Sequence, residues 1–267
     1  MNGSGNARKT ALITGASSGI GLELARAAAA DGCDLVLVAR SKDALERLAE
    51  ELRGAHGVAA RVIAKDLAEP QAPAEIAAEL AAAGVNVEVL VNDAGVGTWG
   101  RFADRDPEGE MRTVRVNVAA LTHLAALFLP EMVRRGSGRV LNVASTAAFQ
   151  PGPLMAVYYA SKAYVLSFSE ALAAELAATG VTVTVLCPGP TRSDFQRRAG
   201  MHKVRIASGT IAMQSCATVA RAGWRGMRRG KRVVIPGWIN KALVQSVRFG
   251  PRRLVAAVAL RLNARPE

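Results

Sequence analysis

The stretch TALITGASSGIG, residues 10–21, sets the interpretation of the whole chain. An apolar run over residues 10–14 has the length of a strand, and an alanine- and leucine-rich helix pattern over residues 20–30 follows the glycine- and serine-rich turn. A glycine turn that leads from a strand into a helix suits a phosphate, because backbone amides point at the anion and the helix dipole favours negative charge. We predict a dinucleotide site here, with a turn that binds no ligand as the alternative. The expected contacts are Gly15, Ser17, Ser18, Gly19 and Ile20.

Strand and helix patterns alternate along most of the chain. Further strands are expected at residues 35–39, 59–64, 87–91, 139–144, 181–186 and 232–235, and further helices at residues 42–53, 74–83, 107–133, 157–178 and 219–228. Ser41 is expected to cap the helix that begins at Lys42. Strands that are apolar throughout and separated by helices indicate a parallel sheet covered on both faces, with right-handed crossovers. The predicted fold class is α/β, a single doubly wound parallel sheet of the Rossmann type.

The C-terminal part of the chain differs from the rest in pattern and charge. Residues 190–214 have no strong period and are expected to form a substrate loop within a domain of residues 1–236, followed by a basic helical extension at 237–267. Residues 192–267 contain 17 basic and two acidic residues, net +15, whereas residues 1–191 contain 17 and 20, net −3. Such asymmetry can indicate an anionic partner, although solvated helix faces explain it equally simply.

Composition excludes several classes of protein. With 50% hydrophobic and 21% charged residues, the 267-residue chain can bury a sizeable core and is not globally disordered. Three scattered cysteines without a CxxC pair argue against a disulfide scaffold or a zinc site and suit a reducing cytoplasm. The three histidines have no ligand-like spacing, so no metal is expected, and no signal peptide or membrane-spanning stretch is expected either. The histidines are His56, His123 and His202.

Arg40 lies where the second predicted strand ends. NAD sites place an acidic residue at this position to bind the ribose 2′-hydroxyl, whereas a nearby arginine accommodates a 2′-phosphate. The strand here ends Val38-Ala39-Arg40 and has no acid. Arginine can hold a phosphate through two parallel hydrogen bonds. We therefore predict that Arg40 selects NADP(H); the alternative is an arginine that only ends the strand.

Tyr158 and Lys162 are four residues apart in a predicted helix and so share a face. A lysine ammonium beside a phenol favours the phenolate, which would lower the tyrosine pKa below its reference of about 10. Tyr158 would then serve as an acid or base near neutral pH. The neighbouring Tyr159 has Ala163 at the corresponding position and is not the candidate. Taken alone, this spacing is common among surface pairs.

The motifs, in their order, resemble the short-chain dehydrogenase/reductase family over roughly residues 8–236. The resemblance rests on the turn at 14–21, Asp66-Leu67 after the third strand, Asn92-Asp93-Ala94-Gly95 after the fourth, Asn117, Ser145, Tyr158 with Lys162, and Pro188-Gly189 after the sixth. Ser145 precedes Tyr158 by the 13 residues usual in that family.

The resemblance implies a catalytic tetrad of Asn117, Ser145, Tyr158 and Lys162. Ser145 would bind the substrate oxygen, Tyr158 would transfer the proton, Lys162 would hold the nicotinamide ribose and tune Tyr158, and Asn117 would position a water in a proton relay. The other implied cofactor contacts are Asp66 and Leu67 with Asn92, Ala94 and Gly95 on the adenosine side, and Pro188, Gly189 and Thr191 at the nicotinamide end.

One position departs from the family, and one group of residues bears on the substrate. The family usually has Asn-Asn-Ala-Gly, so Asp93 is expected to affect stability or cofactor affinity rather than catalysis. Apolar residues stand where the family builds its substrate wall, which favours a hydrophobic ketone or alcohol. These are Phe149, Met155, Phe195 and Met201, and Trp99 and Phe102 are further candidates, with plain packing as the alternative.

Together these observations predict a cytoplasmic, NADP(H)-dependent oxidoreductase that interconverts a carbonyl compound and an alcohol. A 3-oxoacyl-thioester or hydroxysteroid-type reductase is one alternative. A non-catalytic NADP-binding regulator is another, although Ser145, Tyr158 and Lys162 are all present. The family resemblance implies a homodimer or homotetramer formed through helices at about 107–133 and 157–178. Nucleic acid is not an expected partner, whereas weak membrane-surface contact through residues 238–263 is an alternative role for the tail.

Overall fold

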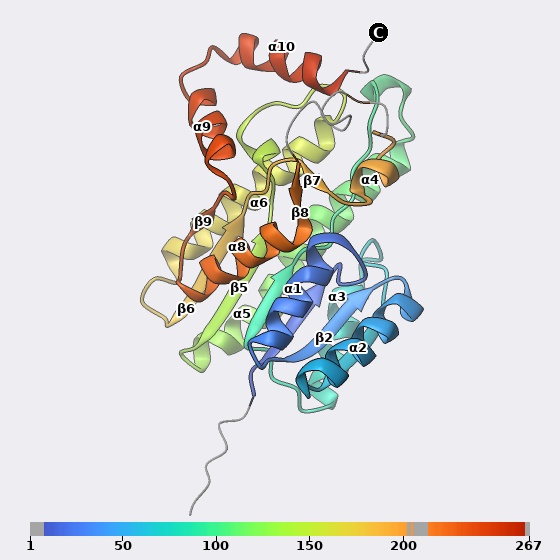
Figure 1. The fold of residues 1–267 in the computed structure, drawn as a ribbon, viewed down its shortest axis with the longest axis vertical. Coiled ribbons are helices and arrows are strands. Elements are labelled where there is room, and N and C mark those ends of the chain that lie inside the picture. The colour runs from blue at the N-terminus through green and yellow to red at the C-terminus, as the bar shows by residue number, and fades with distance from the viewer. Residues whose placement is uncertain (1–7, 202–203, 205–212, 265–267) are drawn as a thin grey trace, which may run out of the picture.

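A parallel sheet forms the centre of the molecule. The computed structural model describes residues 8–201, 204 and 213–264 (Figure 1). Its sheet has seven strands, all parallel, in the order β3-β2-β1-β4-β5-β6-β9. The strands are β1 (Thr10–Thr14), β2 (Asp34–Ala39), β3 (Ala60–Ala64), β4 (Val89–Asn92), β5 (Gly138–Val143), β6 (Val181–Leu186) and β9 (Val233–Val234). This is the doubly wound Rossmann-type sheet that the apolar strand pattern predicts.

Helices cover both faces of the sheet and extend beyond it. The helices are α1 (Gly19–Ala30), α2 (Lys42–His56), α3 (Ala72–Ala82), α4 (Pro107–Val114), α5 (Leu121–Arg134), α6 (Ala156–Glu175), α7 (Phe195–Arg198), α8 (Cys216–Arg228), α9 (Trp238–Val247) and α10 (Arg252–Asn263). In one core α1, α2 and α8 pack on the sheet, and in the other α3, α5 and α6 pack on the opposite face. Figure 1 shows α9 and α10 beyond the sheet, on the side away from α2.

The chain reverses its direction of winding between β1 and β4. Strands β1 to β3 run outward in one direction, and β4 then pairs with the other side of β1 before β5 and β6 continue away from it. Connections that leave β1 and β4 at their carboxyl ends diverge and leave a crevice, which is where such sheets bind ligands. The fold thus places the glycine turn and the residues after Asn92 side by side.

The structure corrects the expected elements in several places. The helix expected at 107–133 is interrupted by a π-helix, Arg115–Ala120, between α4 and α5. Helix α2 does begin after Ser41, but the Ser41 side chain makes no capping hydrogen bond. Within the segment expected to lack regular structure, a short parallel pair forms between β7 (Thr191–Arg192) and β8 (Gln214–Ser215), with α7 between them. Residues 202–203 and 205–212 of this segment, which include His202, lie outside the described residues.

A helical stretch in the described part of the chain has membrane-spanning length. Helix α4, the π-helix and α5 together form 28 helical residues, 107–134. An 18-residue window within them has a mean hydropathy of 1.5. By length and composition this contradicts the expectation of no such stretch. Its apolar side chains are used inside the protein, however, because Leu124, Leu129 and Met132 pack in the core between α5 and the sheet.

Candidate active site

A cavity of about 950 Å³ opens at the carboxyl ends of the strands. Its wall combines the glycine turn after β1, the ends of β2 and β3, the segments after β4 and β5, the start of α6, and the segment after β6. Nearly all of the residues predicted from the sequence line it: Gly15, Ser17, Ser18, Gly19, Ile20, Arg40, Asp66, Leu67, Ala94, Gly95, Ser145, Tyr158, Lys162, Pro188, Gly189 and Thr191. Only Asn92 and Asn117 are not among the lining residues.

The glycine turn is shaped for close approach. Gly15 has φ +72°, and a Cβ there would stand 2.9 Å from the backbone nitrogen of Ala94. A Cβ on Gly21 would lie 2.5 Å from the carbonyl oxygen of Gly15, so the turn must fold back tightly on the start of α1. Ser18 at the N-cap makes no side-chain capping bond, which leaves the amides of Gly19 and Ile20 to a ligand at this helix end, while the Gly21 amide donates to Asp93. The turn therefore fits a diphosphate.

The residues expected on the adenosine side have different surroundings. Arg40 lies exposed at the cavity edge directly after β2. Asp66 accepts hydrogen bonds from the Ala68 backbone amide at 3.0 Å and from the Arg112 guanidinium at 2.6 Å. Burial opposes the charge of the Asp66 carboxyl, but these two donors hold its pKa below the usual range. Asp66 is thus an ionised acceptor with one oxygen held by an arginine that the sequence motifs do not mark.

The Asn92 side chain does not line the cavity. Its side chain is 3% exposed and donates to the Asn142 side-chain oxygen at 2.9 Å, while Asn142 donates to the Ser169 hydroxyl at 2.9 Å. Alternate residues of a strand face opposite sides of the sheet, and the Asn92 side chain faces the interior rather than the cavity. The Asn92 side chain therefore joins β4 to β5 and, through Asn142, to α6, and a cofactor contact at Asn92 stays a prediction.

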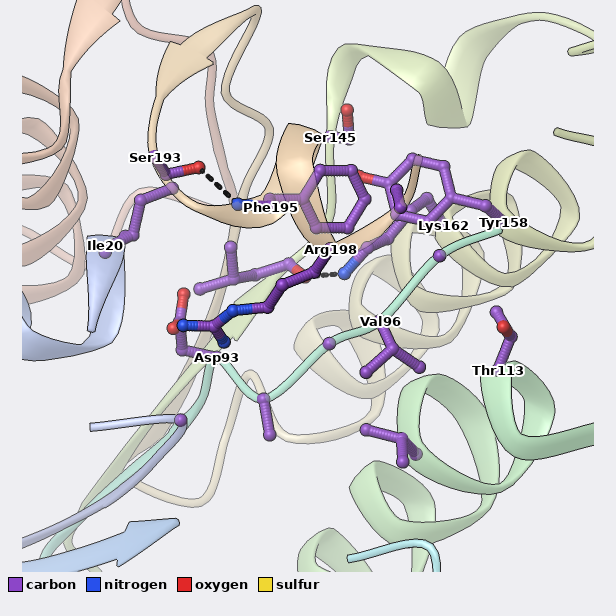
Figure 2. A pocket seen from close by; sticks show the side chains of 18 of the residues that line it. Ile20, Asp93, Val96, Thr113, Ser145, Tyr158, Lys162, Ser193, Phe195 and Arg198 are labelled. Atoms are coloured by element: carbon purple, nitrogen blue, oxygen red, sulfur yellow. Dashed lines mark hydrogen bonds between the residues drawn. The ribbon is translucent and has the colours of Figure 1, made fainter. Parts of the chain in front are cut away.

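Ser145, Tyr158 and Lys162 meet in the cavity between the glycine turn and the apolar residues (Figure 2). Ser145 follows β5, and its hydroxyl interacts with the Tyr158 side chain. Both Tyr158 and Lys162 lie in the first two turns of α6, as their spacing predicts. The Lys162 Nζ donates to the Val143 carbonyl oxygen at 2.8 Å and lies 5.8 Å from the centre of the Tyr158 ring.

The pKa of Tyr158 is raised in the structure, whereas the sequence predicts that it is lowered. Burial raises the phenol pKa above its ordinary value, and the hydrogen bond with Ser145 only partly opposes this effect. Burial also lowers the pKa of Lys162 to about 8, against the attraction of Asp93. The expected lowering fails because the ammonium is bonded to Val143 and the cavity wall removes water from the phenol. Tyr158 therefore stays protonated at neutral pH, which suits a proton donor.

Asn117 does not line the cavity but bonds to the backbone of Val96, which does. Its side-chain nitrogen donates to the Val96 carbonyl at 2.9 Å and to the Ser161 hydroxyl at 3.0 Å, and its oxygen accepts from the Val96 amide at 2.9 Å. The residue lies in the π-helix, whose wider turn is common at functional sites. In this structure Asn117 holds the backbone beside Gly95 in place, and its part in a water relay remains a prediction.

Asp93 lies half-buried beneath the glycine turn and lines the cavity. Its carboxylate accepts a hydrogen bond from the Gly21 amide, and its backbone amide donates to the Thr14 hydroxyl at 3.1 Å. Burial raises the Asp93 pKa to about 7, although Lys162 and the Gly21 amide act in the opposite direction. Asp93 thus links the turn to Lys162, and its charge changes near neutral pH.

The far end of the cavity is apolar. Met155 and Met201 are buried and line it together with Phe195, whose ring centre lies 5.1 Å from that of Tyr158. Two other candidates do not reach it. Phe149 packs instead with a separate apolar cluster under α6, and Phe102 is 65% exposed on the surface.

Two lining residues that no motif marks come from distant segments. Arg198, in α7, donates to the Ser18 hydroxyl at 3.0 Å and so joins the substrate loop to the glycine turn. Asn263, at the end of α10, is fully buried and bonds to Tyr159, to Pro153 and, through its backbone oxygen, to the Trp99 indole. Trp99 thus supports the cavity end through the tail instead of lining it. Sequence reasoning had no signal for either residue because only folding brings these segments to the cavity.

The family model described as short chain dehydrogenase matches residues 9–203. A short chain dehydrogenase of Pseudocercospora fijiensis is 37% identical over 189 residues, which cover 70% of this chain and 61% of that protein. The chain therefore belongs to the short-chain dehydrogenase/reductase family, whose members are oxidoreductases that bind a nicotinamide cofactor.

Solved structures share this fold over nearly their full length. A short-chain dehydrogenase from Sphingobium yanoikuyae in complex with NADPH has a TM-score of 0.81 and 35% identity, covering 91% of this chain and 94% of that one. The bulky-bulky ketone specific alcohol dehydrogenase from Comamonas testosteroni has a TM-score of 0.77 and 32% identity, covering 91% and 92%. Both similarities extend beyond the family-model match into the C-terminal part of the chain.

Proposed function

We propose that this protein is an NADP(H)-dependent oxidoreductase that interconverts a hydrophobic ketone and its alcohol. One observation carries the proposal: a single cavity joins the glycine turn to Ser145, Tyr158 and Lys162, and ends among apolar side chains. The cofactor end fits a diphosphate, the middle holds a proton donor, and the far end is lined by apolar side chains. A non-catalytic regulator would not need the middle part.

NADP(H) is proposed over NAD(H) because of the end of β2. Arg40 lines the cavity there, and no carboxylate follows the strand to bind a ribose 2′-hydroxyl. The NADPH complex of the Sphingobium yanoikuyae protein is consistent with this choice. Gly15, Ser17, Ser18, Gly19 and Ile20 would hold the diphosphate. Asp66, Leu67, Ala94 and Gly95 would lie on the adenosine side, and Lys162, Pro188, Gly189 and Thr191 at the nicotinamide end.

The chemistry divides between the cofactor and three side chains. A bound nicotinamide would supply or accept the hydride at the carbonyl carbon. The Ser145 hydroxyl would donate a hydrogen bond to the substrate oxygen, which holds the carbonyl next to Tyr158. Tyr158 would transfer its proton to the oxygen as negative charge develops, and its raised pKa keeps that proton available at neutral pH. Lys162, held by Val143, would orient the ribose and stabilise the resulting phenolate.

A substrate panel tests this function directly. Oxidation of NADPH and of NADH would be followed spectrophotometrically with small ketones, bulky aromatic ketones, hydroxysteroid ketones, aldehydes and 3-oxoacyl thioesters. We expect NADPH to support the higher kcat/KM and bulky apolar ketones to react best. Better turnover with a 3-oxoacyl thioester would replace the substrate class but keep the reaction. No oxidation of either cofactor with any substrate, together with tight NADPH binding, would favour the regulator.

The remaining expectations concern assembly, boundaries and location. Residues 1–236 are proposed as the catalytic domain and 237–267 as an appended extension, in a cytoplasmic homodimer or homotetramer. The helices implied for assembly carry exposed apolar side chains, among them Leu127 on α5 and Tyr164 on α6, which are 37% and 38% exposed. Light scattering of Leu127→Arg should show a smaller particle than the unmodified protein if these helices form the interface.

A further inference from the structure

The C-terminal arm, residues 237–264, exposes an unusual number of large apolar side chains. The exposed fractions are 78% for Trp238, 49% for Ile239, 55% for Leu243, 87% for Phe249, 59% for Leu254, 47% for Val258 and 45% for Leu260. The same residues include five cations and no acid: Lys241, Arg248, Arg252, Arg253 and Arg261. An apolar and cationic surface of this kind on the end of the molecule (Figure 1) requires an explanation.

Most side chains of the arm do not pack against the rest of the protein. Only Val244 is buried in α9, and only Ala259 and Asn263 are buried in α10. The inner side of the arm is anchored by Asn263, which bonds to the Tyr159 hydroxyl at 3.3 Å and to the Pro153 carbonyl at 3.0 Å. The arm is thus docked along one side, and its apolar side chains Leu254 and Val258, one turn apart, remain on the outside.

We propose that the outer surface of the arm binds the surface of an anionic lipid bilayer. Helices that carry aromatic and aliphatic side chains beside Lys and Arg lie in the interfacial layer of membranes, where apolar groups enter the lipid and cations meet the headgroups. The twelve-residue α10 is too short to span a bilayer, which requires about 20 residues. The arm therefore lies on the membrane and does not cross it.

Charge distinguishes lipid from a second copy of the chain. In a two-fold symmetric dimer the same patch faces itself, so five cations would meet five cations without a carboxylate between them. An anionic bilayer supplies the opposite charge and an apolar interior together. The patch also contains few aromatic side chains for stacking on bases, with Trp238 at the start of α9 and Phe249 beyond its end.

The position of the arm gives membrane binding a consequence for the site. Asn263 anchors α10 and also lines the cavity, so the lipid-facing helix is part of the cavity wall. A bilayer on the outer side of the arm would lie close to the apolar end of the cavity, next to Met155 and Phe195. This geometry favours a carbonyl substrate that partitions into lipid, a corollary that rests on the proposed function.

Vesicle sedimentation tests the proposal independently of turnover. The full-length protein would be mixed with vesicles of phosphatidylcholine alone, and with vesicles of an equal mixture of phosphatidylcholine and phosphatidylglycerol, at low and high salt. We expect binding to the anionic vesicles only, and weaker binding at high salt because exposed charges are screened. No binding to anionic vesicles at low salt would overturn the proposal.

Two matched sets of variants locate the surface. Replacing Lys241, Arg248, Arg252 and Arg253 by Gln should weaken binding at least about a hundredfold, since each basic residue near an anionic surface contributes roughly fivefold. Replacing Arg221, Arg225, Arg229 and Lys231 by Gln removes the same charge from α8 and its end and should cost less than about tenfold. Equal losses in the two sets would show that net charge, not the arm, is responsible.

A further pair of variants tests how much the exposed apolar side chains contribute to vesicle binding. Trp238→Ser with Phe249→Ser should weaken vesicle binding by about tenfold or more, whereas Phe102→Ser, at a side chain 65% exposed elsewhere, should not change it. Light scattering of the same variants separates lipid from self-association. A smaller particle for the Trp238/Phe249 variant, with vesicle binding unchanged, would overturn the proposal and assign the surface to a second copy.

Discussion

The two ends of the cavity are built in different ways. The cofactor end consists of short segments that directly follow β1, β2, β3 and β4, and parallel strands bring their carboxyl ends to one edge of the sheet. The apolar end includes Met155, Phe195, Met201 and Asn263, which come from the N-cap of α6, the segment after β7 and the C-terminal arm. The first end therefore depends on the sheet, and the second depends on how peripheral segments dock.

This difference implies that substitutions should divide into two groups. Changes at the cofactor end should affect nucleotide affinity and leave the substrate KM nearly unchanged, and changes at the apolar end should do the reverse. Tyr158 and Lys162 stand between the two ends and should affect the chemical step itself. Arg198, which bonds to Ser18, connects the two ends and should affect both.

The largest effect is expected at Tyr158. Tyr158→Phe removes the proton donor, and general acid catalysis typically contributes about 10²–10⁴-fold, so kcat should fall by that amount while the Kd for NADPH stays within about twofold. Tyr159→Phe is the matched control and should reduce kcat by less than about tenfold, because Tyr159 bonds to Asn263 and not to Ser145. Equal losses in the two variants would refute the assignment by spacing.

The next effect is expected at Arg40. Arg40→Asp replaces a proposed 2′-phosphate partner with a repelling charge, and a lost charge-assisted hydrogen bond costs about 1.5–3 kcal/mol. The Kd for NADPH, measured by fluorescence titration, should rise by roughly a hundredfold, and the Kd for NADH should change little. A similar loss for both cofactors would mean that Arg40 does not contact the 2′-phosphate.

A smaller effect is expected where the arm meets the cavity. Asn263→Ala removes the side-chain donor to the Pro153 carbonyl and one of the two side-chain partners of the buried Tyr159 hydroxyl, the other being Gln150. A lost hydrogen bond of this kind costs about 0.5–1.5 kcal/mol. The substrate KM should rise by about tenfold because the cavity wall loosens, with the NADPH Kd nearly unchanged. Ser246→Ala, on the exposed side of α9, should leave both constants as they are. An increase confined to the NADPH Kd would contradict the division into two ends.

The smallest effect is expected at Asp93 and depends on pH. Because burial raises its pKa from 3.8 to about 7, the folded state binds a proton that the unfolded state has lost between these values. This contribution to stability is fully present below pH 3.8 and is lost as pH rises to about 7. The Tm of the unmodified protein should therefore fall relative to Asp93→Asn between pH 5 and pH 7, by roughly 2–4 °C or more. A constant Tm difference over that interval would show that Asp93 does not titrate there.

The strand and helix pattern was sufficient to predict the doubly wound sheet. Apolar strands and amphipathic helices carry their own period, so the ends of most elements agree with the expected ranges within a few residues. The π-helix at Arg115–Ala120 was not predictable, because its local pattern is that of an α-helix and its wider turn is stabilised by contacts of Asn117 with Val96. The shift of Asn92 away from the cavity has a similar origin, since its partner Asn142 lies on the neighbouring strand.

The sequence by itself determined the parallel sheet, the glycine turn, the position of Arg40 and the spacing of Tyr158 and Lys162, because each of these is set by neighbours within a few residues. Only the tertiary structure decided which residues close the substrate end and in which direction the Tyr158 pKa moves. Burial comes from elements far apart in the chain, and removal of water from the phenol outweighs a charge 5.8 Å from its ring centre. The docking of Asn263 against Tyr159 and Pro153 likewise depends on segments more than 100 residues apart.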